Sequence, residues 1–254
     1  MTGAASPLPP SSALAGVSGI VVATYVALGW CLDWPGSWRL RRAIDPAHER
    51  RAREVALHAS ERMRSWRDEN ARAKAGSIVF LGSSTIERMP LAELFPGKPA
   101  LNRGVARASA PELLAWLDRM LPSAPPAAFV VYAGSIDRRE GNASDAEVVE
   151  RVRELLLALR SRAPSAAVAL IGVLPSRDRA HDVAELDRRL ADLARDPALR
   201  IDFVPTLRPP ISSAEGFLAE GFSSDALHLD EQGYRLLARW ILDDGGEAGR
   251  LLAP

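Results

Sequence analysis

Cysteine is almost absent from this chain of 254 residues, which contains Cys31 alone. One thiol excludes an intramolecular disulfide, so cysteine usage indicates no redox compartment. Histidine is scarce as well, and the four residues stand apart at positions 48, 58, 181 and 228. Because none of them belongs to a Cys/His cluster with zinc spacing, we expect no bound metal.

An excess of charge of either sign is also missing. The chain carries 32 basic and 32 acidic residues, so its formal net charge is zero. A nucleic-acid-binding protein needs a basic excess on some face, and we therefore expect no nucleic-acid partner. No internal repeat is visible, and the length suits one ordinary domain with an appendage.

No lysine or arginine precedes Arg39. Residues 1–12 are small, polar and proline-rich, and we expect them to be disordered. Residues 13–32 hold no charge and are about long enough to span a bilayer as a helix. We favour an uncleaved anchor or signal helix over residues 13–34, because a cleaved signal peptide usually opens with a basic residue; a buried core helix is the other alternative. An aromatic belt at the far end supports an anchor: Trp30, Trp34 and Trp38.

This anchor predicts a single-pass, membrane-attached protein that contacts the bilayer through residues 13–32. Taken literally, the positive-inside rule places the following domain in the cytoplasm, because Arg39, Arg41 and Arg42 follow the span. The rule is a bias, so the side of the membrane stays open. Residues 35–47 are expected to form a linker.

A helix is predicted over residues 46–74, where charged residues surround an apolar face formed by Val55, Ala59, Met63 and Trp66. After it, apolar runs alternate with helical segments. Alternation of this kind predicts a mostly parallel sheet that helices cover on both faces. The expected strands are 78–81, 99–101, 128–133, 167–172 and 201–204.

Several helix starts are marked by a capping residue. Asp230 is expected to cap the last helix, and residues 244–254 are expected to be a loose tail. In three other places a capping-box pair is predicted: Ser109 with Glu112, Ser144 with Glu147, and Asp182 with Glu185.

The run "IVFLGSS" is a buried strand that ends in two adjacent hydroxyls, Ser83 and Ser84. A turn is the simple interpretation. The alternative is a nucleophile at the carboxyl end of a parallel strand, where open α/β sheets bind their ligands. Serine then needs a base and a carboxylate that orients it. Asp225 and His228, three residues apart beyond the fifth strand, could supply both at the same sheet edge.

Four blocks together make the chain recognisable. They are "VFLGSSTIERMP", "LNRGVARAS", "VVYAGSIDRREGN" and "DALHLDEQGY". In this order they resemble the SGNH hydrolases, also called GDSL-type esterases and lipases, and most of all the branch whose first block is G-S-S-[ST]-I. The resemblance covers residues 48–243. It implies a flavodoxin-like, three-layer α/β/α sandwich around a five-stranded parallel sheet, preceded here by the N-terminal hydrophobic helix.

Carried over by position, the resemblance implies that Ser84 is the nucleophile, His228 the general base and Asp225 the carboxylate that orients it. The backbone N–H of Ser84 would also donate to the oxyanion. The other two oxyanion-hole positions depart from the family. Arg107 stands where the second block usually has glycine, and Ile136 where the third block has the asparagine that donates from its side chain.

Loss of one oxyanion donor typically lowers the rate about 100- to 1,000-fold. Arg107 keeps its backbone N–H, but at positive φ it would be strained. Its guanidinium either folds back over Ser84 or points into solvent; both interpretations are kept.

The leading hypothesis is therefore a membrane-tethered serine ester hydrolase that cleaves a small acyl ester of a carbohydrate, lipid or other small molecule, without a cofactor. The alternative is a catalytically weakened relative that binds a ligand or partner in the old cleft. Acyl transfer to an acceptor other than water shares the same triad. The acyl group, the alcohol and the oligomeric state are not determined by the sequence.

Overall fold

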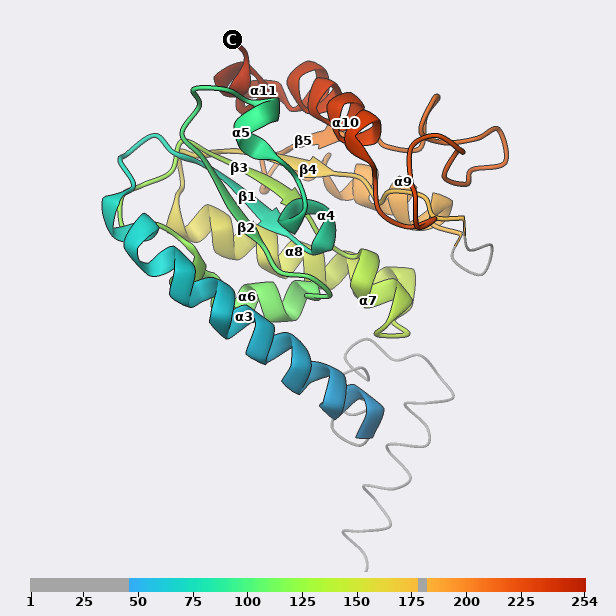
Figure 1. Cartoon of the computed structure of the whole chain (residues 1–254), viewed down its shortest axis with the longest axis horizontal. Helices are drawn as coiled ribbons and strands as arrows, with labels where there is room; N and C mark the ends of the chain where they lie inside the picture. The colour runs from blue at the N-terminus through green and yellow to red at the C-terminus, as the bar shows by residue number, and fades with distance from the viewer. Residues whose placement is uncertain (1–45, 178–181) are drawn as a thin grey trace, which may run out of the picture. The chain divides into compact units, whose positions relative to one another are not determined.

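The computed structural model of the protein describes residues 46–177 and 182–254 (Figure 1). Its strands are β1 (Ile78–Gly82), β2 (Ala100–Gly104), β3 (Ala128–Tyr132), β4 (Ala167–Ile171) and β5 (Asp202–Val204). Its helices are α3 (Pro46–Arg72), α4 (Ser84–Glu87), α5 (Leu91–Leu94), α6 (Ala110–Met120), α7 (Ser135–Arg139), α8 (Asp145–Arg162), α9 (Ala184–Leu193), α10 (Glu231–Asp244) and α11 (Gly246–Leu252).

All strand pairs in the five-stranded sheet are parallel, and the strand order is β2-β1-β3-β4-β5. The chain moves outward from β1 in one direction to β2, and then in the other direction to β3, β4 and β5. The order therefore reverses beside β1. In open α/β sheets, the carboxyl ends of the strands at such a reversal form a crevice in which ligands bind. The predicted α/β fold with five parallel strands is confirmed.

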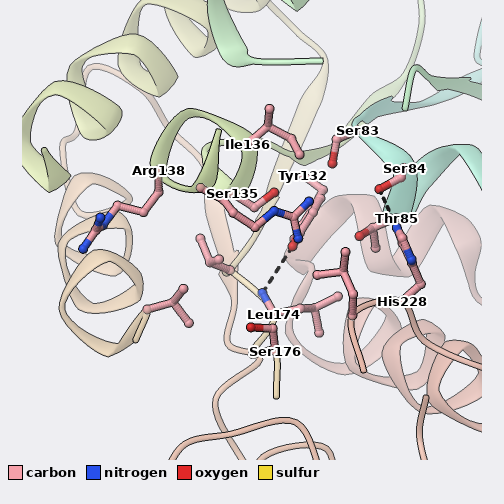
Figure 2. Close-up of a pocket in the computed structure, with 14 residues that line it drawn as sticks. Ser83, Ser84, Thr85, Tyr132, Ser135, Ile136, Arg138, Leu174, Ser176 and His228 are labelled. Carbon is pink, nitrogen blue, oxygen red and sulfur yellow. Dashed lines mark hydrogen bonds between the residues drawn. The ribbon is translucent and has the colours of Figure 1, made fainter. Parts of the chain in front are cut away.

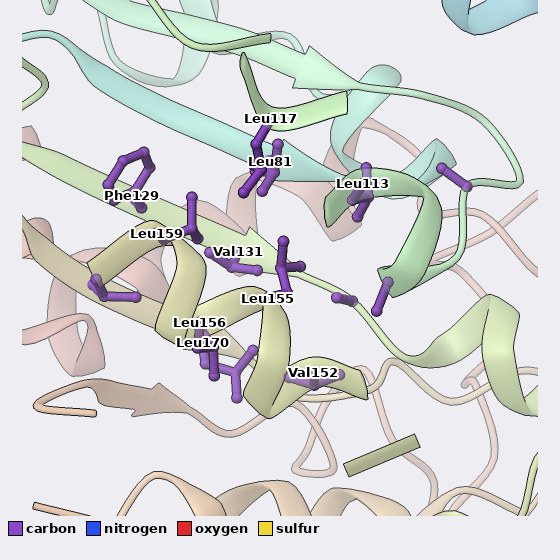
Figure 3. Packing of buried hydrophobic residues seen from close by; sticks show 14 of the residues in the cluster. Leu81, Leu113, Leu117, Phe129, Val131, Val152, Leu155, Leu156, Leu159 and Leu170 are labelled. Atoms are coloured by element: carbon purple, nitrogen blue, oxygen red, sulfur yellow. The ribbon is translucent and has the colours of Figure 1, made fainter. Parts of the chain in front are cut away.

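Helices cover both faces of this sheet, as Figure 1 shows. Alternate strand residues point to opposite faces, so that Val79, Leu81 and Val131 join one buried cluster while Phe80 and Val130 join the other. The first cluster packs against α3, α6, α8 and α9, and the second against α5, α10 and α11. Figure 3 shows the first cluster, in which the leucines of α6 and α8 meet the strands: Leu113, Leu117, Leu155, Leu156 and Leu159.

The predicted charged helix is confirmed as α3 (Pro46–Arg72). Val55, Ala59, Met63 and Trp66 are all buried against the sheet. Full burial of a side chain such as Val55 or Met63 stabilises the folded protein by about 1.5–3 kcal/mol. The apolar face therefore docks α3 on the sheet, although the helix is strongly polar on average.

Three of the four predicted helix starts are confirmed. Capping boxes form between Ser109 and Glu112 and between Ser144 and Glu147, and Asp230 accepts a hydrogen bond from the Gly233 N–H at the start of α10. The start at Asp182 is wrong, because α9 begins at Ala184 after Val183, which is buried. Asp182 instead accepts a hydrogen bond from the Ala184 N–H.

The loose tail predicted for residues 244–254 is also wrong. α10 runs to Asp244, and after a break at Gly245 the chain forms α11. Ala248 and Leu252, one turn apart, are buried in the second cluster. The run of acidic residues and glycines concealed this small apolar face.

The hydrophobic segment at 13–32 lies outside the described residues, and with it the predicted boundaries at 1–12, 13–34 and 35–47. Within the described ranges, no helix is both long and apolar enough to cross a bilayer. The membrane attachment stays a prediction.

Candidate active site

Ser84 lies at the turn between β1 and α4. Ser83 is the extended N-cap residue, and Ser84 is the first residue of the helix. Just before this turn the backbone lies so close to β3 that a side chain would not fit. A Cβ at Gly82 would lie 2.4 Å from the Tyr132 carbonyl oxygen. Glycine at this position therefore lets β1 deliver the Ser84 hydroxyl at the sheet edge.

The three side chains singled out in the first and last sequence blocks lie within hydrogen-bond distance of one another. The Nε2 atom of His228 is 3.1 Å from Ser84 Oγ, as Figure 2 shows, and its Nδ1 atom is 2.7 Å from Asp225 Oδ2. A carboxylate only accepts, so His228 donates Nδ1–H to Asp225 and presents Nε2 as an acceptor to serine.

Asp225 is anchored by its own loop. Its Oδ1 atom accepts the backbone N–H groups of His228 at 2.7 Å and of Leu227 at 3.0 Å. Desolvation acts to raise the pKa of Asp225, but the hydrogen bonds from His228 and Leu227 outweigh it and hold the pKa below the ordinary range. The carboxylate is therefore ionised at neutral pH and fixes the imidazole ring. The catalytic roles of these residues stay a prediction.

Arg107 has φ +62°. The strain expected for arginine at the glycine position of the second block is therefore present in its left-handed backbone. Its guanidinium lies against Glu140 and Glu54, and its carbonyl oxygen accepts a hydrogen bond from Arg51. It is not among the described side chains that line the pocket beside Ser84. Arg107 thus does not fold over Ser84: its guanidinium lies at the solvent-exposed surface, where two carboxylates hold it.

Two backbone donors face no acceptor in the described part of the chain: the N–H groups of Ser84 and Arg107 make no hydrogen bond there. Ser84 is at the first position of a helix, where the N–H has no partner within the helix. The backbone of both predicted oxyanion positions is therefore free to donate.

Ile136 lies on α7, which begins after Gly134 in the left-handed conformation with φ +101°. Its side chain is buried and lines the pocket. The position at which the resemblance predicts an asparagine therefore lines the same pocket as Ser84, but it holds a side chain that cannot donate.

The pocket beside Ser84 and His228 has a volume of about 480 Å³ including the space open to solvent. It collects residues from the carboxyl ends of β1, β3 and β4, and Figure 2 shows many of them. Six of its polar lining residues had no predicted role, although five of them lie in the first and third blocks: Thr85, Tyr132, Ser135, Arg138, Arg139 and Ser176.

Tyr132 is a buried residue that lines this pocket. Burial raises the pKa of its hydroxyl, against the opposing effect of hydrogen bonds with Ser135, Thr85 and the Leu174 N–H, the last at 3.4 Å. The tyrosine therefore stays neutral and ties together the ends of β1, β3 and β4.

Other polar residues near the site have structural partners. Asp137 is buried and accepts hydrogen bonds from the Ala110 N–H and from Arg151, so it fixes its loop. His58 pairs with Glu87 at 2.9 Å. In the described ranges, no group of three or more His, Cys, Asp or Glu residues is arranged to hold a metal ion.

Comparison with known proteins gives two curated relatives of modest identity. The chain is 26% identical over 196 residues to platelet-activating factor acetylhydrolase IB subunit alpha1 of Bos taurus, which covers 71% of this chain and 83% of that protein. It is 25% identical over 201 residues to the Homo sapiens protein of the same name, with 73% and 85% covered.

Solved structures share the fold at lower identity. A protein from Streptococcus pneumonia, provisionally described as a platelet activating factor, is 21% identical with a TM-score of 0.68, over 78% of this chain and 97% of that one. A GDSL-like lipase from Bacteroides thetaiotaomicron is 19% identical with a TM-score of 0.59, over 71% and 95%.

The match to a family is broader. Residues 85–236, more than half of the chain, match the GDSL-like lipase/acylhydrolase family. The match begins directly after Ser84 and includes Asp225 and His228. The chain therefore belongs to the GDSL-like lipase/acylhydrolase family, whose members are also called SGNH hydrolases.

Proposed function

We propose that the protein is a serine ester hydrolase in which Ser84 attacks the acyl carbonyl of a small ester. The observation that carries the proposal is the chain of contacts from Ser84 Oγ to His228 Nε2 at 3.1 Å and from His228 Nδ1 to Asp225 at 2.7 Å. This is the arrangement that a serine needs to lose its proton as it attacks.

In the first half-reaction, Ser84 Oγ forms a bond to the carbonyl carbon while its proton moves to His228 Nε2. Asp225 stabilises the imidazolium that results. The tetrahedral intermediate then collapses, the bond to the alcohol oxygen breaks, and that oxygen takes the proton from Nε2. An acyl group remains on Ser84.

In the second half-reaction, water gives a proton to His228 and attacks the acyl carbon. Collapse of this intermediate releases the acid, and the proton returns to Ser84. An acceptor alcohol in place of water would complete an acyl transfer by the same steps. The bovine and human relatives are named as acetylhydrolases, and this short acyl group supports small acyl esters as first substrates.

The oxyanion would be held by the backbone N–H groups of Ser84 and Arg107, with no donor from Ile136. An active site that lacks one donor is expected to be slower by about 100- to 1,000-fold, yet still far faster than water alone. The same substitution is what favours the second candidate, a weakened relative that binds a ligand in this pocket.

A fluorophosphonate probe and p-nitrophenyl acetate distinguish the two candidates. The hydrolase should be labelled by the probe and should release p-nitrophenol, and Ser84→Ala should abolish both. Ser65→Ala is the matched control, because Ser65 is exposed on α3 and its hydroxyl donates to the Arg62 carbonyl oxygen of its own helix, away from the pocket. A folded wild-type protein that shows neither reaction would favour the binding candidate.

A further inference from the structure

The guanidinium of Arg139 is poorly paired in the described part of the chain. Arg139 is the last residue of α7 and lines the same pocket as Ser84 and His228. Its side chain is only 25% exposed, and its one ion pair there is a distant contact of 3.9 Å with Glu140. No hydrogen bond from it forms within the described residues. The neighbouring Arg138, by contrast, pairs with Asp145 at 2.9 Å.

Among the described residues that line the pocket, none carries a negative charge that would compensate this cation. The described lining includes two arginines and no aspartate or glutamate. Partial burial of a guanidinium costs solvation, and a close anion would offset that cost. Arginine also presents a planar fork of N–H groups that matches a carboxylate or a phosphate.

Hydroxyl donors lie in the same pocket. Ser176, just beyond the end of β4, is 8% exposed, and its Oγ atom has no hydrogen-bond partner within the described ranges. A buried hydroxyl without a partner is uncommon, because leaving it unpaired costs free energy. Ser135, whose hydroxyl also bonds Tyr132, adds a second hydroxyl on the wall that carries Arg139. Cation and hydroxyls together are the donors that an anionic oxygen would need.

We propose that the substrate of this pocket carries an anionic group, a carboxylate or a phosphate, in addition to its ester, and that Arg139 binds this group with help from Ser176. The inference rests on the proposed function, because it concerns the molecule whose ester Ser84 attacks. Arg139 then sets specificity: the anion is held in the pocket while the ester carbonyl meets the serine.

The test compares an anionic ester with a neutral one of similar size, p-nitrophenyl hemisuccinate and p-nitrophenyl butyrate. The wild-type protein should prefer the hemisuccinate in kcat/KM. Arg139→Gln should lower the ratio of the two kcat/KM values about 10- to 100-fold, as expected for the loss of a charge-assisted hydrogen bond. Arg139→Lys should restore part of this ratio. Arg195→Gln, at an exposed arginine on the surface, should leave the ratio as it is.

Equal losses with both esters in Arg139→Gln would overturn the inference, because a general catalytic or structural role moves both rates together. A wild-type protein that hydrolyses the butyrate through Ser84 without preferring the hemisuccinate would overturn the inference for a carboxylate and leave the hydrolase proposal standing; titration with inorganic phosphate then decides the inference for a phosphate.

Calorimetry decides the inference even if neither ester is cleaved. Succinate and inorganic phosphate are titrated separately into the full-length Ser84→Ala protein and into Ser84→Ala with Arg139→Gln. Binding of either anion that the second substitution weakens at least about tenfold supports the site and identifies the anion class. Absence of binding by both anions refutes the site, whether or not the protein is an esterase.

Discussion

Glu87 accepts a hydrogen bond from the backbone N–H of Ala106, so that the short helix behind Ser84 holds the loop that carries Arg107. The two segments also pack closely, because a Cβ at Gly104 would lie 2.1 Å from the Glu87 nitrogen. His58 contacts the same Glu87 carboxylate from α3. The predicted nucleophile, Ser84, and the predicted second oxyanion donor, Arg107, are thus connected through the side chain of Glu87.

This contact predicts a positioning role for Glu87. In Glu87→Ala the loop loses its acceptor, and we expect kcat for p-nitrophenyl acetate to fall about ten- to a hundred-fold with little change in KM, since a displacement near 1 Å has effects of this size. Glu87→Gln keeps an acceptor and should retain most of the activity. The control is Glu61→Ala on the exposed face of α3. A rise in KM with unchanged kcat would argue against positioning.

Replacing Ile136 with asparagine should restore a donor to the pocket. Because an oxyanion donor is worth about 100- to 1,000-fold, we expect Ile136→Asn to raise kcat at least about tenfold, even with imperfect geometry. Ile136→Leu, which also fills the site but cannot donate, should show no gain. If the asparagine variant folds normally, as judged by thermal unfolding, and remains as slow as the leucine variant, the altered oxyanion hole is not what limits turnover.

The left-handed backbone at Arg107 predicts an unusual order of stabilities. Both Arg107→Gly and Arg107→Ala remove the contacts to Glu54 and Glu140, but only glycine adopts φ +62° without strain. The glycine variant should therefore have a free energy of unfolding about 1 kcal/mol above that of the alanine variant. At Arg64, inside α3, the order should reverse by about the same amount. Urea unfolding of the four variants checks both signs.

Asp187 predicts a pH dependence of stability. Burial raises its pKa to about 6, although the Val173 N–H donates to its carboxylate. Its pKa in the unfolded chain is lower, about 3.9. The folded protein therefore binds more protons between about pH 4 and pH 6, so stability is lost as the pH rises through this window.

Asp187→Asn removes the cost of this ionisation and keeps an acceptor for Val173. We expect it to raise the free energy of unfolding by about 1–3 kcal/mol at pH 8 and by much less at pH 4.5. Urea unfolding at the two pH values measures the difference, and Asp243→Asn, at an exposed position on α10, is the control. A gain of equal size at both pH values would show that ionisation is not its cause.

The fold was largely predictable because its strands are short apolar runs and most of its helices begin at side chains that cap them. Prediction failed where polar residues are buried. β2 extends to Gly104 through Asn102 and Arg103, and Arg103 is fully buried with its guanidinium paired to Glu69 and Asn70. Such a strand looks like a loop in the sequence, because its partners are about thirty positions away.

The contacts within the candidate site were predictable where the residues stand in short local patterns. Ser84, Asp225 and His228 stand in short patterns whose chemistry is apparent from the residue types. The pocket was not predictable, because its charge depends on the directions of side chains. Arg138 and Arg139 both line it, but only Arg138 has a close carboxylate partner among the described residues. The paired guanidinium of Arg107 was undetermined for the same reason.

The contacts of α3 also bear on how the protein can be produced in the laboratory. A fragment trimmed to residues 85–236 would lose β1, Ser84 and the whole of α3. A fragment that begins at β1 would keep Ser84 but lack Arg51, which donates a hydrogen bond to the Arg107 carbonyl oxygen. It would also expose to solvent the apolar face of the sheet that Trp66 covers. Shortened versions for crystallisation or fusion should therefore start no later than Pro46.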